Sequence, residues 1–169
     1  MKKLIALLAF AMALNTVAAQ QPVEVEIPDL SAYILTPKPA ATPRINGAKV
    51  FGLRPGSPCI YTIPATGDRP MTFSAEGLPK GLKLDEKTGR ISGTLKKEGT
   101  YHVMLKATND KGSYERELRI VVGDKLALTP PMGWNSWNCW ARDGTQEQVL
   151  SSARAMVESG LVNHGWTYI

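Results

Sequence analysis

The chain has 169 residues, of which 43% are hydrophobic and 21% charged, and its formal net charge is +5. This composition excludes a wholly disordered protein, and the length fits one domain, or one domain and part of another. The positive charge is too mild to favour nucleic acid as a partner, and Lys96 and Lys97 form the only basic pair after the N-terminus.

The first nineteen residues have the pattern of a secretory signal peptide. Lys2 and Lys3 precede an apolar run at residues 4–14, and small residues follow at positions 17–19. The alternative, a membrane anchor, is disfavoured because the run is shorter than the ~20 residues that span a bilayer. We therefore expect cleavage after Ala19 and export to the periplasm or the medium, without a membrane span.

The cysteines and histidines are few. Export permits a disulfide, but Cys59 and Cys139 fall in different predicted domains. Either both thiols are free, or one pairs with a cysteine outside this chain. Neither His102 nor His164 stands near a cysteine at the spacing of metal ligands, so we expect no metal site and no cofactor.

Residues 20–44 form a proline-rich lead-in. Five prolines in this stretch cannot all occupy regular elements. Residues 23–27 alternate between apolar and acidic side chains, which fits a short edge strand. The rest of the lead-in is predicted to be extended.

Residues 45–123 have the alternating pattern of a β-sandwich. Apolar residues recur at every second position, and turn-forming Gly, Asp and Asn separate the runs. In the strand at 101–107, we expect Tyr101, Val103, Leu105 and Ala107 to face the core. The predicted strands are residues 48–52, 60–63, 71–75, 82–84, 90–94, 101–107 and 114–122.

This region resembles a known family. Residues 78–85 (LPKGLKLD), 88–94 (TGRISGT) and 99–101 (GTY) are similar to the bacterial "putative Ig" domain, which is immunoglobulin- or cadherin-like. Gly89 has a structural reason to be there, because a turn at this point requires a positive φ angle. The resemblance implies an Ig-like sandwich.

The role of the sandwich is less specified by its residues. Four aromatic residues lie on the alternating pattern, so core packing is the preferred interpretation over a sugar-binding platform: Tyr61, Phe73, Tyr101 and Tyr114. Asp110 and Asp124 are too few and too far apart for a cadherin-like calcium site. We expect a spacer or docking domain.

Residues 126–169 predict a strand, a helix and a second strand. Thr145 and Gln148 fit a capping box at the start of the helix. Gly160 stands where a helix ends on a left-handed residue, and residues 165–169 (GWTYI) fit the start of a strand. One such βαβ unit cannot cover its own faces, so we expect the chain to stop within a domain. The helix places its apolar residues on one face: Val149, Leu150, Ala153, Met156 and Val157.

The densest motif is residues 130–138, which read PPMGWNSWN. This motif, together with residues 165–169, resembles the opening of glycoside hydrolase family 27, the family of α-galactosidases and α-N-acetylgalactosaminidases. The resemblance implies a (β/α)₈ TIM barrel with its active site at the carboxyl ends of the strands. The predicted fold class is mainly β: an Ig-like sandwich at 45–123, followed by the first βαβ unit of an incomplete barrel at 126–169.

The resemblance assigns roles to two tryptophans. Trp137 occupies the position of the family's second motif Trp, which packs against the sugar, and an indole suits the patch of C–H groups on galactose. From spacing alone, core packing would account for Trp137 equally well. Trp134 matches the first Trp and is predicted to be a barrel-core residue. Cys139 departs from the family pattern, which puts the family's disulfide in doubt.

The catalytic residues are not expected in this chain. Family members use two aspartates with carboxyls ~5–5.5 Å apart, and the resemblance places both beyond Ile169. Asp143 is interpreted as a polar loop residue, and Glu147 and Glu158 as residues on the exposed side of the helix. The chain alone is therefore expected to be inactive.

Together these features predict an exported, retaining α-galactosidase that removes terminal α-linked galactose from oligo- or polysaccharides. The alternative is a secreted Ig-like interaction or carbohydrate-binding module. The choice between galactose and N-acetylgalactosamine, the linkage and the oligomeric state stay open.

Overall fold

The computed structural model describes residues 29, 32 and 37–169. The predicted signal peptide at 1–19 and the predicted strand at 23–27 lie outside the described residues. Residues Lys38–Ile169 form one compact unit. Within the described part of the chain, no helix has both the length and the apolar character needed to cross a membrane.

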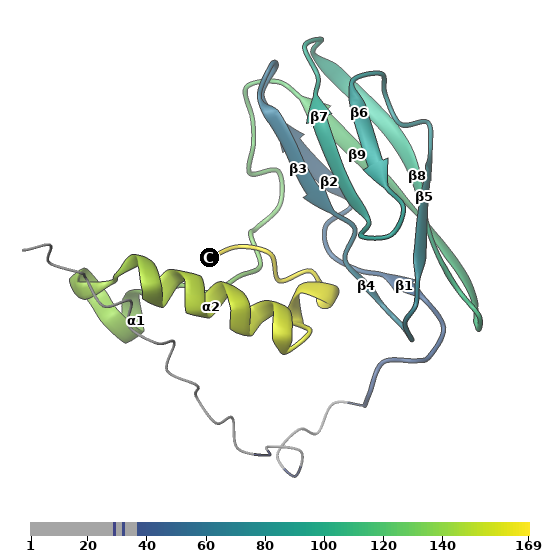
Figure 1. Cartoon of the computed structure of the whole chain (residues 1–169). Coiled ribbons are helices and arrows are strands. Elements are labelled where there is room, and N and C mark those ends of the chain that lie inside the picture. The colour runs from purple at the N-terminus through teal and green to yellow at the C-terminus, as the bar shows by residue number, and fades with distance from the viewer. Residues whose placement is uncertain (1–28, 30–31, 33–36) are drawn as a thin grey trace, which may run out of the picture. The chain divides into compact units, whose positions relative to one another are not determined.

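Two facing sheets form the sandwich (Figure 1). The larger has the order β2 (Val50–Leu53), β9 (Gly112–Val122), β8 (Gly99–Asn109) and β5 (Thr72–Glu76). The smaller has the order β3 (Pro58–Thr62), β7 (Arg90–Thr94) and β6 (Leu82–Asp85). Two short strands, β1 (Arg44–Ile45) and β4 (Ala65–Thr66), pair with each other, antiparallel. Among these nine described strands, all pairs are antiparallel except β2 with β9, which is parallel.

The core of the sandwich follows the period-two pattern. Val103, Leu105 and Ala107 on β8 are at most 1% exposed, as the sequence predicts for this strand. The other sheet supplies Ile91, which is fully buried, and Cys59, which is 1% exposed. Burying a side chain such as Ile91 stabilises a fold by about 1.5–3 kcal/mol.

The hairpin of β6 and β7 requires glycine at two positions, Gly89 and Gly93. The Asp85 carboxylate accepts hydrogen bonds from the backbone N–H groups of Lys87 (2.9 Å) and Thr88 (3.1 Å), which stabilises its charged form and lowers the pKa of Asp85. Gly89 then adopts φ +71° to close the turn. At Gly93, a Cβ would collide with a backbone carbonyl oxygen of the neighbouring segment. The predicted hairpin is therefore confirmed.

All seven predicted strands of the sandwich are confirmed, with ends that move by at most two residues. The pair β1 and β4 was not predicted, because two-residue strands show no periodicity. The prediction that Tyr114 packs in the core is wrong, since this residue is 39% exposed. It pairs with Ala107 near the tip of a hairpin whose strands have 11 residues each, longer than any strand of the facing sheet.

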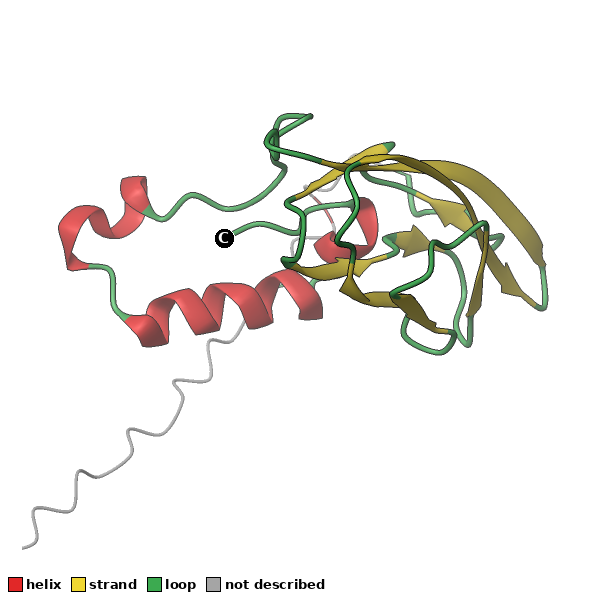
Figure 2. Ribbon diagram, turned by 90° about the horizontal axis from the view of Figure 1, so that it is seen from above, coloured by secondary structure: helices red, strands yellow, loops and turns green. Residues whose placement is uncertain are grey.

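Helices occupy the C-terminal segment, residues 126–169 (Figure 2). They are α1 (Trp137–Trp140), η2 (Ala141–Asp143), α2 (Gln146–Glu158) and η3 (Leu161–His164). The capping box is confirmed: the Gln148 N–H donates to Thr145 Oγ1 (3.3 Å), and the Thr145 N–H donates to Gln148 Oε1 (2.7 Å). Gly160 has φ +78° after the end of α2, as predicted.

The two predicted strands of this segment are reduced to one parallel bridge, between Gly133 and Tyr168. The Trp134 N–H donates to the Tyr168 carbonyl (2.9 Å), and the Thr167 N–H donates to the Met132 carbonyl (3.0 Å). The direction is that of a βαβ unit, but the structure does not confirm the first unit of a TIM barrel. A parallel pair is stable when neighbouring strands pair with its edges and helices cover its faces. Among the described residues, no further strand pairs with either segment.

Candidate substrate-binding site

The bridge between Gly133 and Tyr168 determines where the following loop begins. Both segments run in the same direction through the bridge, so their carboxyl ends lie at the same edge. A Cβ on Gly133 would collide with the Tyr168 carbonyl oxygen, so glycine permits this close approach. Trp137 follows four residues after Gly133 and therefore lies beyond the carboxyl end of the pair.

Trp137 is held by its backbone and leaves its ring accessible. Its N–H donates to Asn135 Oδ1 (2.9 Å), and the N–H groups of Cys139 and Trp140 both donate to the Ser136 carbonyl (3.0 Å each). These bonds fix the start of α1, while the Trp137 residue is 60% exposed. The described residues therefore do not bury it in a core.

Trp134, the predicted barrel-core residue, is 42% exposed, because the described residues of this chain do not cover it. It belongs to a larger set: of the fourteen exposed large hydrophobic residues in the described part of the chain, eleven lie in the C-terminal segment. Only Met156 among the hydrophobic residues of this segment is buried. The eleven are Leu126, Met132, Trp134, Trp137, Val149, Leu150, Val157, Leu161, Trp166, Tyr168 and Ile169.

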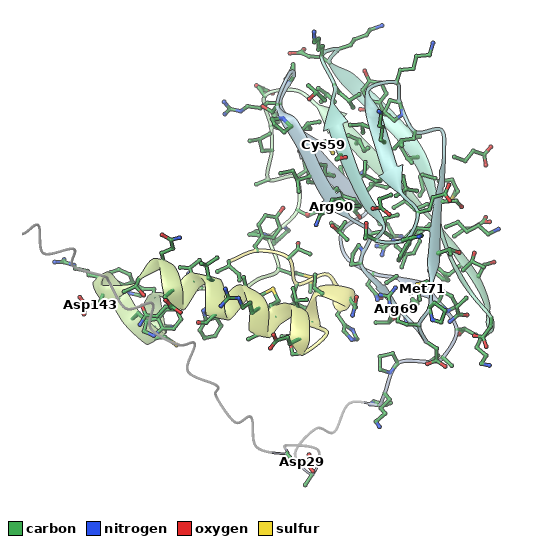
Figure 3. All side chains as sticks on the ribbon, in the orientation of Figure 1. Asp29, Cys59, Arg69, Met71, Arg90 and Asp143 are labelled. Carbon is green, nitrogen blue, oxygen red and sulfur yellow. The ribbon has the colours of Figure 1, made fainter. Side chains whose placement is uncertain are left out.

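Glu147 and Glu158 are not placed as the paired carboxyls of a retaining glycosidase. Asp143 is exposed on η2, between α1 and α2 (Figure 3). Glu147 and Glu158 are exposed at the two ends of α2, which puts them ~16 Å apart along the helix axis. The described residues contain no group of three or more His, Cys, Asp or Glu that could hold a metal ion.

The residue directly after α1 has a strained backbone that the sequence did not predict. Ala141, directly after α1, has φ +45° and ψ −114°, and its N–H donates to the Trp137 carbonyl. It is the one non-glycine residue with a positive φ in the described part of the chain. Such conformations cost of order 1–3 kcal/mol and are found at functional sites. An alanine gives no sequence signal of this kind.

The two cysteines do not pair with each other. Cys59 lies in the sandwich core (Figure 3), where burial raises the pKa of its thiol. Cys139 is exposed on α1.

Comparison with known families and proteins finds similarity for both parts of the chain. Residues 42–123 match the family described as "Putative Ig domain". The chain is 46% identical over 44 residues to a "Probable alpha-galactosidase" of Dictyostelium discoideum, which covers 26% of this chain and 11% of that protein. It is 40% identical over 58 residues to an "Alpha-galactosidase" of Coffea arabica, covering 34% and 15%. Both resemblances found in the sequence are confirmed.

Two crystal structures from Bacteroides fragilis extend this similarity. They are a "putative alpha-galactosidase" and a "putative alpha-galactosidase/melibiase", with 50% and 52% sequence identity and a TM-score of 0.71 each. Each covers 75% of this chain, so the match includes residues beyond the Ig-like part. The chain spans 27% of the length of either structure, and 11–15% of the two curated relatives.

Proposed function

We propose that this chain, which joins a member of the Putative Ig family to a segment homologous to α-galactosidases, belongs to an exported retaining glycoside hydrolase. Its substrates are oligo- or polysaccharides that end in α-linked galactose. The observation that carries the proposal is the exposed Trp137. This residue belongs to the motif at 130–138 that resembles the family, and it follows the carboxyl end of the parallel bridge between Gly133 and Tyr168.

The role of Trp137 follows from its exposure and its place. An indole packs its flat apolar face against the C–H groups of a sugar ring, and the hydroxyl groups are left for polar partners. Because the Trp137 N–H is bonded to Asn135 Oδ1, the ring starts from a fixed backbone position. Trp137 therefore positions the sugar and takes no part in proton transfer.

Catalysis itself is proposed to need aspartates that lie outside this sequence. A retaining glycosidase requires a nucleophile and an acid/base with carboxyls ~5–5.5 Å apart, and Glu147 and Glu158 are too distant from each other to serve. Apart from Trp137, the exposed hydrophobic residues of the C-terminal segment support the same conclusion, since further barrel elements would cover them. The chain alone is then expected to hydrolyse no α-galactoside.

The alternative function, a sugar-binding sandwich, receives less support. The Tyr61 ring packs at 59° and 5.3 Å against Phe51, and Phe73 is 3% exposed. The Tyr101 hydroxyl donates to the Lys97 carbonyl (2.9 Å). These rings are engaged with their own domain, and Tyr114 alone makes no platform.

The direct test uses the product of the complete coding gene. We expect it to release the aglycone from an aryl α-galactoside, and the 169-residue chain to release none. Trp137→Ala should raise KM about tenfold with a smaller change in kcat, since lost stacking removes binding of about 1.5 kcal/mol. Trp137→Phe is the matched control and should recover part of the loss. A complete protein without activity on α-galactosides, or an unchanged KM in Trp137→Ala, would refute the proposal.

Export has its own test. Mass spectrometry of the mature protein from the culture medium or periplasm should find an N-terminus at Gln20. An intact Met1 or Lys2 terminus in the cytoplasmic fraction would contradict it.

A further inference from the structure

A polar junction of Asn46, Arg69 and Asn163 joins the sandwich to the C-terminal segment. Asn46, which follows β1, donates from Nδ2 to the backbone carbonyl of Asn163 in η3 (3.0 Å). Arg69 donates from an η-nitrogen to Asn163 Oδ1 (3.1 Å). Asn163 thus accepts bonds from two separate parts of the sandwich, one through its backbone and one through its side chain.

The sandwich holds both donors in place before they reach Asn163. The Asn46 N–H donates to the Pro64 carbonyl (2.8 Å), and Nδ2 also lies 3.1 Å from Thr66 Oγ1. Arg69 donates to the Ala65 carbonyl (3.1 Å), and its guanidinium lies 5.8 Å from the centre of the Phe73 ring. Figure 3 shows Arg69 at the end of the sandwich where β1 and β4 pair.

Arg116 of β9 also holds the loop that carries Asn46. Its two terminal nitrogens donate to the carbonyls of Ile45 (2.9 Å) and Gly47 (2.7 Å). The loop backbone therefore has a defined position on the sandwich, and Asn46 loses little freedom when it bonds to η3.

Two glycines allow the backbones to touch at this junction. A Cβ on Gly165 would lie 2.7 Å from the Gly47 Cα, closer than real side chains come. Gly165 has φ +99° and Gly47 has φ +76°, so neither position accepts another residue without strain. Gly165 is buried, although most residues around it in the C-terminal segment are exposed.

We propose that the Ig-like domain is an intramolecular brace: it docks on η3 through Asn46, Arg69 and the Gly47–Gly165 contact, and so orders the start of the segment that pairs with Gly133. The C-terminal segment needs such support, because α2 has 13 residues and a helix of this length is marginal on its own. The superposition on the two Bacteroides fragilis structures, which extends beyond the Ig-like part, agrees with a fixed arrangement. The brace does not depend on the proposed enzymatic activity.

The four tryptophans provide the test, because all of them lie in the C-terminal segment and none in the sandwich. Tryptophan emission therefore reports on the docked segment, while protection of the buried Cys59 thiol from a thiol reagent reports on the strands of the sandwich. In urea, the two signals of the full chain should unfold at the same midpoint. In Asn46→Ala and Arg69→Ala, the tryptophan transition should move to lower urea and separate from the strand transition.

A double-mutant cycle isolates the junction from effects within the sandwich. Arg69→Ala and Asn163→Ala should each change the docking equilibrium about fivefold, and the double variant no more than either alone. Asn163→Asp should keep the coupling, because its carboxylate accepts from Arg69. Arg54→Ala, an exposed residue outside the junction, is the matched control. Separate transitions in the unmodified chain, or an unmoved tryptophan midpoint in every junction variant, would overturn the proposal.

Discussion

The close approach of Gly133 to Tyr168 makes a sharp prediction for the C-terminal segment. In Gly133→Ala, the new Cβ would collide with the Tyr168 carbonyl oxygen, which is backbone and cannot rotate away. The two segments must then separate. Three backbone hydrogen bonds join them: Trp134 N–H to the Tyr168 carbonyl (2.9 Å), and the Thr167 and Tyr168 N–H groups to the Met132 carbonyl (3.0 and 3.3 Å).

The magnitude follows from these bonds. At a net value of about 1 kcal/mol for each, Gly133→Ala should lower the free energy of unfolding of the segment by about 2–3 kcal/mol. Gly144→Ala is the matched control in the same segment. Nothing lies within 4 Å of its Cβ position and its φ is −63°, so this change should be neutral or stabilise by about 0.4–1 kcal/mol.

The assay is urea unfolding of the full chain, followed by tryptophan emission. Gly133→Ala should unfold at clearly lower urea than the unmodified chain, and Gly144→Ala at the same concentration or higher. If the two variants unfold at the same midpoint, the bridge does not hold the segment, and the placement of Trp137 beyond a parallel pair is refuted.

Three further predictions concern single groups. Burial raises the pKa of the Tyr61 hydroxyl from 10.0 to about 12. The uncharged hydroxyl therefore contributes its full stabilisation below pH 10, and this contribution is lost as the pH rises through 12. Between these pH values, Tyr61→Phe should lose less thermal stability than the unmodified chain. The lowered pKa of Asp85 stabilises the fold above the ordinary value of 3.8, and this contribution disappears as the pH falls; Asp85→Ala should therefore lower Tm at pH 7 but not at pH 2. Ala141→Gly should relieve the backbone at φ +45° and raise stability by about 1 kcal/mol, whereas Ala141→Val should lower it, as chemical denaturation would show.

The sandwich could be predicted from the sequence because its signals are local. The alternation at residues 101–107 identifies the inward face of β8, and the turn at Asp85–Gly89 identifies a hairpin from its residue types. The prediction for Tyr114 was wrong because alternation gives the face of a strand but not its length, and the strands of the facing sheet are shorter than β9. Nor does the pattern show that β2 runs parallel to β9, since pairing partners are set by the whole fold.

The site was only partly predictable for a related reason. The capping box fixed the start of α2 from two residues, and the motif at 130–138 located Trp137. Neither the capping box nor the motif could show the strain at Ala141. The hydrogen bonds from Asn46 and Arg69 to Asn163 were also hidden, because they join residues about a hundred positions apart in the chain. A sequence shows that a glycine is present; it does not show which backbone approaches it.

The positions of the junction and of Trp137 lead to one functional consequence. The junction acts on η3 and Gly165, just before the segment that pairs with Gly133, whereas Trp137 lies just after that pair. The brace therefore supports the amino end of the pair, and the candidate sugar contact lies at its carboxyl end. In a (β/α)₈ barrel the amino ends of the strands serve stability and the carboxyl ends carry the active site. Within the proposed enzyme, weakening the junction should thus lower stability while leaving KM unchanged, the opposite of what Trp137→Ala should do.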